Sequence, residues 1–80
     1  MFRKTQKQPY ESLTNIGDYY EVTIMEDDSL GNEIHSVIRC ELRGWDHEEE
    51  TGLLYVILWE DGHTRAQEHY VGDILKVKTL

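Results

Sequence analysis

The stretch LLYVILWEDGH, residues 53–63, decides the fold expected for this chain. Its first seven residues are apolar on both faces of an extended chain, which indicates a strand buried in a core. Asp61-Gly62 follows between two extended runs, and an Asp-Gly pair in that position is a strong signal of a β-hairpin. The stretch therefore predicts a strand over residues 53–59, a tight turn over 60–63, and a polar partner strand over 63–69.

Alternating runs on either side of this hairpin predict three more strands. Residues 19–25 and 34–43 alternate apolar and polar side chains with a period of two, as strands with one buried face do. The apolar positions are Tyr20, Val22 and Ile24 in the first run and Ile34, Ile38, Cys40 and Leu42 in the second. The pair Ser36-Val37 breaks the second alternation, so we expect a local twist or a β-bulge there. A single turn over residues 70–73 precedes a last short strand over 74–78.

The balance of charge is strongly acidic. Eighty residues leave room for one small domain, and sixteen Asp and Glu against eight Lys and Arg give a formal charge of −8. Without the three cations Arg3, Lys4 and Lys7, five cations remain against sixteen carboxylates, so residues 11–80 carry a charge of −11. This surplus argues against direct binding of nucleic acid over the whole surface.

Small size and short strands together predict a barrel. The first fifteen residues are polar and hold the only proline, and they predict a flexible arm that carries the three cations. Five short antiparallel strands in the remaining residues can bury one face each and protect their edges by closing on themselves. We therefore expect an all-β, five-stranded antiparallel barrel over residues 16–80, preceded by a polar and basic arm over residues 1–15.

Four segments connect this pattern with known small barrels. They are IGDYYEV at residues 16–22, a long second strand with the small residues Ser36 and Cys40, LYVILWEDGH at 54–63, and YVGDILKV at 70–77. On these segments the chain resembles the SH3-like small β-barrels, in particular the Tudor and chromo-barrel branch. The segment from Tyr55 to Val77 is also similar to small bacterial or phage domains of unknown function. The resemblance implies a five-stranded SH3-like or Tudor-like barrel.

The resemblance also raises the question of an aromatic cage. In Tudor-type barrels such a cage binds methylated Lys or Arg through cation–π contacts. The resemblance puts Trp59 at one cage position, whereas the first loop offers Met25 and no aromatic residue, and Asp61 stands where a second aromatic is often found. One wall does not form a cage, so we do not expect a reader of methylated lysine.

Acidic residues gather in the first and third connections, which antiparallel succession places at the same end of a barrel. They are Glu26, Asp27, Asp28 and Glu33 in the first connection and Glu60 and Asp61 in the hairpin turn. With Trp59 beside them, these carboxylates predict an acidic rim that docks a basic protein or peptide surface. The alternative is a solvated acidic surface that serves only solubility.

Two aromatic surfaces are further candidates for contact with a partner. Trp45 lies in the acidic connection 44–52, where it either contacts a partner or folds back to cap the barrel. Tyr55, Ile57 and Trp59 form the outward face of the third strand, which needs a cover: the arm, a second copy of the chain, or a partner. The partner-binding residues predicted from the sequence are Trp59, Tyr55, Ile57, Asp61, Glu60, Asp27, Asp28 and Trp45.

Catalysis, cofactors and metals find little support in the sequence. The four histidines lie on different predicted elements, Cys40 falls on the inward side of a strand, and no phosphate-binding or nucleophile motif is present. We expect no enzyme activity, no catalytic residue, no cofactor and no metal site. The longest apolar run has seven residues and no secretory signal is recognisable, so we expect a free-standing cytoplasmic protein outside membranes.

These observations favour a non-enzymatic interaction module or small regulatory inhibitor. Its acidic surface would bind a basic partner, and one specific version is mimicry of nucleic acid in the basic groove of a nucleic-acid-binding protein. A first alternative is a nucleic-acid-associated barrel that uses the basic arm with Arg39, Arg43 and Arg65. A second alternative is a structural component that forms a homodimer or a larger homo-oligomer.

Overall fold

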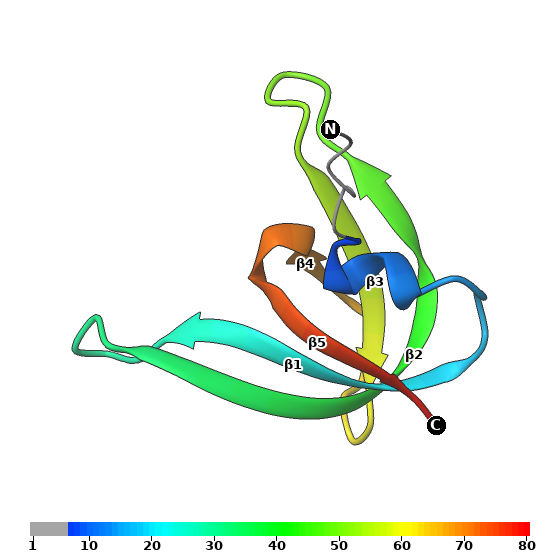
Figure 1. The fold of residues 1–80 in the computed structure, drawn as a ribbon, viewed down its shortest axis with the longest axis horizontal. Helices are drawn as coiled ribbons and strands as arrows, with labels where there is room; N and C mark the ends of the chain where they lie inside the picture. The colour runs from blue at the N-terminus through cyan, green and yellow to red at the C-terminus, as the bar shows by residue number, and fades with distance from the viewer. Residues whose placement is uncertain (1–6) are drawn as a thin grey trace, which may run out of the picture.

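The computed structural model describes residues 7–80, and the fold is all-β with five antiparallel strands in one sheet. A short 3₁₀ helix precedes the first strand, and a second 3₁₀ helix joins the last two strands (Figure 1). The elements are η1 (Pro9–Ser12), β1 (Tyr19–Asp27), β2 (Glu33–His47), β3 (Leu54–Glu60), β4 (Gln67–Tyr70), η2 (Val71–Asp73) and β5 (Ile74–Thr79). The prediction of an all-β, five-stranded antiparallel chain is confirmed.

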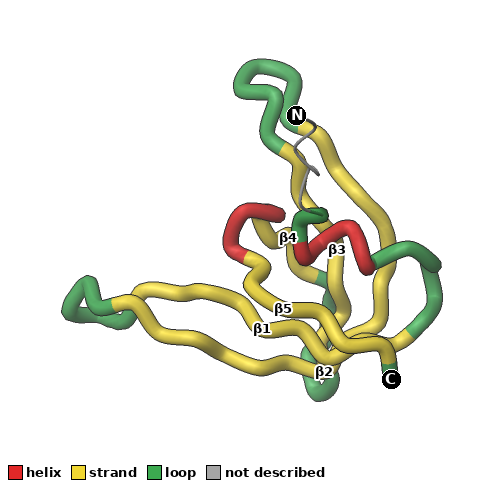
Figure 2. The backbone as a smooth tube through the Cα atoms, viewed as in Figure 1, coloured by secondary structure: helices red, strands yellow, loops and turns green. Residues whose placement is uncertain are grey.

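The sheet is organised around the long strand β2. The strand order is β4-β3-β2-β1-β5, so β2 pairs with β1 along its first part and with β3 along its second part. Figure 2 shows the result: the β1–β2 hairpin and the β2–β3 hairpin point away from each other, and the two 3₁₀ helices lie in the angle between them. The sheet is therefore strongly bent, with an inner side that carries the core and an outer side.

The bend coincides with a β-bulge at Arg43, where the register between β2 and β3 shifts between Leu42 and Gly44. Of the local twist or bulge predicted at Ser36-Val37, the bulge does not form, because the register between β1 and β2 runs there without interruption. Ser36 lies on the inner side, opposite Ile24, and its hydroxyl donates a hydrogen bond to Glu26. A polar pair thus occupies a position at which the alternation predicted an apolar contact.

The inner side is closely packed. The buried side chains are Leu13, Tyr20, Val22, Ile24, Cys40, Leu42, Val56, Leu58 and Ile74, each at most 3% exposed. The inward faces predicted for residues 19–25 and for Cys40 and Leu42 are thus confirmed, and Ile38 is half-buried against this core. Ile34 is the exception at 41% exposed, because it lies on the part of the β1–β2 hairpin that extends beyond the core.

The N-terminal segment is part of the fold from η1 onward. Leu13 is 2% exposed and belongs to the core cluster, and the Tyr20 hydroxyl accepts hydrogen bonds from the backbone N–H groups of Thr14 and Asn15 at 3.4 and 3.2 Å. The prediction of a flexible arm is therefore wrong for residues 9–15, since one leucine anchors this polar stretch. Residues 1–6 of the predicted arm, with Arg3 and Lys4, lie outside the described residues.

Two connections differ from the sequence-based expectation. β2 continues through His47, so Trp45 lies in a strand and not in a loop. β4 begins at Gln67, which pairs with Leu58, and residues 61–66 form a longer connection than a two-residue hairpin. Gly62 still makes a tight turn with φ +86°, a backbone conformation that favours glycine. Within residues 7–80, no helix has the length and apolar character required to cross a bilayer.

Candidate functional site

The candidate site is a cleft between the end of β1 and the short strand β4. It has a volume of about 300 Å³ and is lined by Ile24, Met25, Glu26, Asp27, Glu68, His69, Tyr70 and Asp73. Four of these eight residues carry carboxylates, and no Lys or Arg is among them. We call this feature the β1–β4 cleft. Its lining makes it a place where positive charge would be favoured.

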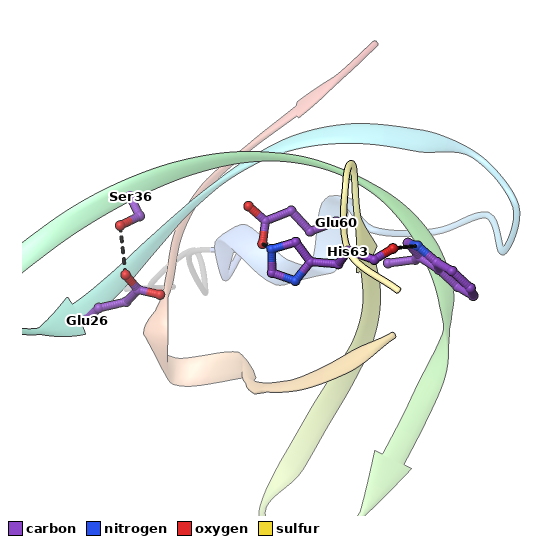
Figure 3. Close-up of polar contacts among 5 residues, drawn as sticks. Glu26, Ser36, Glu60 and His63 are labelled. Atoms are coloured by element: carbon purple, nitrogen blue, oxygen red, sulfur yellow. Dashed lines mark hydrogen bonds and ion pairs between the residues drawn. The ribbon is translucent and has the colours of Figure 1, made fainter. Parts of the chain in front are cut away.

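Glu26 and Glu60 face the inner side from two different strands. Glu26 stands two residues beyond the buried Ile24, and its Oε2 accepts a hydrogen bond of 2.7 Å from the Ser36 hydroxyl. Glu60 follows the buried Leu58 by two residues, and its Oε2 lies 3.1 Å from His63 Nε2. Figure 3 shows both pairs beneath the arch of β2. Strand alternation thus brings carboxylates distant in the sequence to one side of the sheet.

His69 lines the cleft and lies within the electrostatic influence of Glu26 and Glu60. It is half-buried, pairs with the buried Val56 and therefore points to the inner side. Burial lowers the pKa of His69, and the negative charges of Glu26, Glu60 and Asp73 oppose that effect only in part. A neutral imidazole consequently lies among three carboxylates near neutral pH, so His69 leaves their charge uncompensated.

Glu68 adds negative charge at the outer rim of the cleft. Next to it lies Asp46 of β2, and a hydrogen bond from Glu68 to Asp46 raises the pKa of Glu68, with desolvation and the charge of Asp46 adding to the effect. A raised pKa means that the second negative charge is unfavourable at this place. A cation that approaches the rim would relieve this repulsion.

The predicted outward face of β3, with Tyr55, Ile57 and Trp59, lies on the outer side of the sheet, because the alternate residues Val56 and Leu58 are buried on the inner side. Trp59 is held within the chain, because its indole N–H donates a 2.9 Å hydrogen bond to the His63 carbonyl and the Arg43 guanidinium lies 5.0 Å from the ring centroid. Tyr55 packs near Tyr70 with ring centroids 6.0 Å apart and donates a 3.4 Å hydrogen bond to Glu48.

Ile57 is half-buried beside Gly44, the residue opposite it on β2. The described part of the predicted arm packs on the inner side through Leu13 and so does not cover the outward face of β3, where Arg43 of β2 and Tyr70 of β4 lie beside Trp59 and Tyr55.

The acidic rim predicted around Trp59 does not form. Asp27 pairs with Glu33 near the end of the β1–β2 hairpin, whereas Glu60 pairs with Cys40, which lies seven residues farther along β2. This separation amounts to roughly 20 Å along the strand. Asp27 lines the β1–β4 cleft at the end of β1, and Glu60 lies on the inner side near His69, whereas the Trp59 ring lies on the outer side of β3.

Asp28 and Asp61 serve the turns in which they lie. Asp28 Oδ1 accepts hydrogen bonds of 2.8 Å from the backbone N–H groups of both Leu30 and Asn32. These bonds stabilise the charged form and lower the pKa of Asp28. The backbone N–H of Asp61 donates to the carbonyl of Arg39 at 2.9 Å. The Asp28 carboxylate therefore has an evident structural role in its turn, whereas the bond of Asp61 is made by its backbone alone.

Trp45 packs inside the molecule in part. Its position opposite the buried Val56 turns it to the inner side, where its ring meets Tyr10 of η1 edge-on at a centroid distance of 6.2 Å. It remains 37% exposed. The sequence left open whether Trp45 contacts a partner or folds back onto the protein. The contact with Tyr10 of η1 is of the kind that folding back requires.

The basic residues of the alternative function are only partly free. Arg43 lies 3.3 Å from Glu41 in an ion pair and stacks on Trp59. Arg39 belongs to a cross-strand row on the outer side with Glu21 of β1 and Lys78 of β5. Lys76 and Lys78 also line a shallow cavity of about 180 Å³ with Glu21, Thr23 and Val37. The basic residues on the outer side are therefore Arg39 of β2 with Lys76 and Lys78 of β5, in place of the predicted pair Arg39 and Arg43.

Chemistry by metal or thiol has no support in the described residues. Within residues 7–80, no three His, Cys, Asp or Glu side chains are arranged to hold a metal ion. Burial, together with the charges of Glu60 and Asp61, raises the pKa of Cys40 to about 11. The thiol is therefore protonated at neutral pH and a poor nucleophile.

All four residues that the chain after β3 contributes to the cleft were missed by the sequence reasoning, namely Glu68, His69, Tyr70 and Asp73. Their position depends on the turn η2, which leads from β4 to a strand that pairs with β1. The predicted turn over residues 70–73 was a usable signal. A last strand that pairs with the first brings the residues around that turn close to the end of β1.

Comparisons of this chain with protein-family models, with curated proteins and with solved structures found no match. No function can therefore be transferred from a relative. The charge, shape and strand edges of the β1–β4 cleft are the features from which a function can be argued.

Proposed function

We propose that this protein is a non-enzymatic interaction module or small regulatory inhibitor that binds a basic partner through the β1–β4 cleft. The observation that carries the proposal is the lining of the cleft, in which four carboxylates meet without a Lys or Arg. The protein as a whole carries a formal charge of −8, and this long-range attraction would accelerate its encounter with a cationic partner. Mimicry of nucleic acid toward a nucleic-acid-binding protein is the specific version that this charge favours.

The strand order supports the resemblance to SH3-like and Tudor-like barrels. β5 lies beside β1, β4 lies at the other end of the order, and a single 3₁₀ turn joins the two. This is the arrangement that a polar fourth strand, one turn and a closing fifth strand produce in such barrels. In the proposed barrel, the β1–β4 cleft lies where the two ends of the sheet approach each other.

The test compares two variants of equal charge. A fluorescein-labelled nona-arginine peptide is titrated with the protein, and binding is followed by fluorescence anisotropy at 50 and 200 mM NaCl. The double variant Glu26→Gln/Asp73→Asn neutralises the cleft, and the control Glu49→Gln/Glu50→Gln removes the same charge from the connection after β2. We expect the cleft variant to weaken binding roughly fivefold more than the control, and the higher salt to weaken all binding.

Two results would contradict the proposal. Equal losses in the cleft variant and in the control would show that only the net charge matters. Affinity that does not respond to salt would show that the contact is not electrostatic. Circular dichroism and a urea melt of both variants check that each is folded before its affinity is interpreted.

A second function is favoured by the outer side of β5, β1 and β2. Arg39 lies there on β2 and Lys76 and Lys78 lie on β5, on either side of β1, which suits contact with phosphates. A gel shift with short single-stranded DNA and RNA tests this alternative, with Lys76→Gln/Lys78→Gln as the matched variant. A shift that this variant abolishes would favour nucleic-acid association over the acidic interaction module.

A further inference from the structure

We propose that the basic partner binds as an extended strand that pairs with the free edge of β4. This inference rests on the proposed function, because it concerns the same cleft. It adds the conformation of the partner and the groups that hold it, namely the backbone of β4 in addition to the carboxylates. Recognition by strand addition draws affinity from main-chain hydrogen bonds and specificity from alternate side chains.

The first observation is that β4 has only one partner strand. Its four residues pair with β3 over Leu58 to Tyr55, and β4 stands at the end of the strand order. In an antiparallel pair, alternate residues direct their N–H and C=O groups away from the partner. Along β4 these groups have no strand to accept them in the described chain. An edge of this kind is a template for another strand.

The second observation is that β1 also has a free edge where it borders the cleft. β5 pairs with β1 only as far as Ile24, which lies opposite Ile74. Residues 25–27 continue to pair with β2 on their other side, up to Asp27 opposite Glu33. The sheet is thus left open between the end of β1 and β4.

The third observation is the order of the residues that line the cleft. They include the consecutive runs 24–27 of β1 and 68–70 of β4. Successive side chains of a strand point to opposite faces, so a cavity lying over one face touches every second residue. A cavity that touches consecutive residues of two strands lies along their edges. The cleft is therefore the gap at the edges where a strand would fit.

Charge selects the occupant of this gap. Glu26 and Asp27 from β1 and Glu68 and Asp73 beside β4 surround the edge. A second copy of this chain would bring the same carboxylates against one another, which opposes pairing of like edges. An extended segment with Lys or Arg at alternate positions would instead place its cations near Glu26 and Asp73 on the inner side.

The probe for this inference is the capped peptide Ac-KVKVKVK-NH₂. It is compared with two N-methylated derivatives of the same charge, one methylated at its three valine amides and the other at its four lysine amides. Binding is measured by isothermal titration calorimetry at 50 mM NaCl. Exchange of the amide protons of residues 67–70 is followed by NMR. The protein is used as the full chain.

Strand addition predicts that the unmodified peptide binds and slows exchange along the outer edge of β4. The derivative that lacks the pairing N–H groups is expected to bind at least about tenfold more weakly, because several main-chain hydrogen bonds are lost at constant charge. If both derivatives bind within twofold of the parent and exchange in β4 is unchanged, strand addition is wrong while binding of a basic partner stands.

Two further outcomes separate the remaining possibilities. If the unmodified peptide does not bind at low salt, both the proposed function and this inference fail. If light scattering shows a dimer whose β4 amides are protected without peptide, a second copy occupies the edge, and the assignment to a basic partner is overturned.

Discussion

Truncation of Leu13 is the sharpest test of how the N-terminal segment belongs to the fold. The side chain is 2% exposed and lies in the same cluster as the core residues of the strands. Replacing a fully buried leucine by alanine costs about 2–5 kcal/mol, according to how far the site can collapse. Leu13 lies at the margin of the core in a segment that can adjust, so we expect Leu13→Ala to cost about 3 kcal/mol.

The expected loss is a large fraction of the total stability. A chain of this size has a free energy of unfolding of roughly 4–12 kcal/mol. Unfolding in urea, followed by tryptophan fluorescence and circular dichroism, has a slope of about 1 kcal/mol/M for a small domain. The midpoint of Leu13→Ala should therefore lie about 2–3 M below that of the natural sequence.

The control is a neighbouring residue of similar character. Ile16 is 67% exposed, so Ile16→Ala should change the free energy of unfolding by no more than about 0.5 kcal/mol. Equal midpoints for Leu13→Ala and the natural sequence would refute the docking of this segment and restore the flexible arm over residues 9–15. Equal losses in both variants would show that the effect is not specific to the buried position.

Three further predictions follow from individual side chains. Burial raises the pKa of Cys40 to about 11, so we expect no reaction with a thiol reagent at pH 8 until urea unfolds the chain; rapid labelling of the folded protein would contradict the packing. The pKa of His69 is lowered from 6.5, so its contribution to stability is complete above that pH and decreases as the pH falls through the lower folded pKa. An NMR titration of His69 that gives a value above 6.5 would reverse this sign. Trp59 lies on the outer side, so Trp59→Phe should leave the affinity for nona-arginine within twofold; a tenfold loss in the anisotropy assay would place the binding surface on the outer face of β3.

Much of the sheet could be predicted because its buried faces follow a period of two. Tyr20, Val22 and Ile24 are inward in the structure as the alternation requires. The position of the bulge could not be predicted from hydrophobicity alone. Ser36 looked like an interruption, yet its hydroxyl finds Glu26 across the strand pair, and this partner is visible only once the register is known.

The candidate site was harder to predict for the same reason. Acidic loops are obvious in the sequence, but which carboxylates meet depends on where each pairing ends. Glu60 lies opposite Cys40, in the middle of a long strand, and this single register separates it from the tip of the β1–β2 hairpin. The cleft in turn exists because β5 leaves β1 at Ile24. Neither fact follows from the composition of a loop.

The pairing of β1 with β5 also determines when the sheet can be fully formed during synthesis of the protein. Tyr20 lies opposite Thr79, so the first strand finds one of its two neighbours near the other end of the chain. The hairpins β1–β2 and β2–β3 join residues that are close in sequence and can form early, whereas closure of such a long loop is slow. On the ribosome, one edge of β1 therefore stays uncovered until translation has passed Thr79, and this interval is when the nascent chain is most exposed to wrong strand pairing.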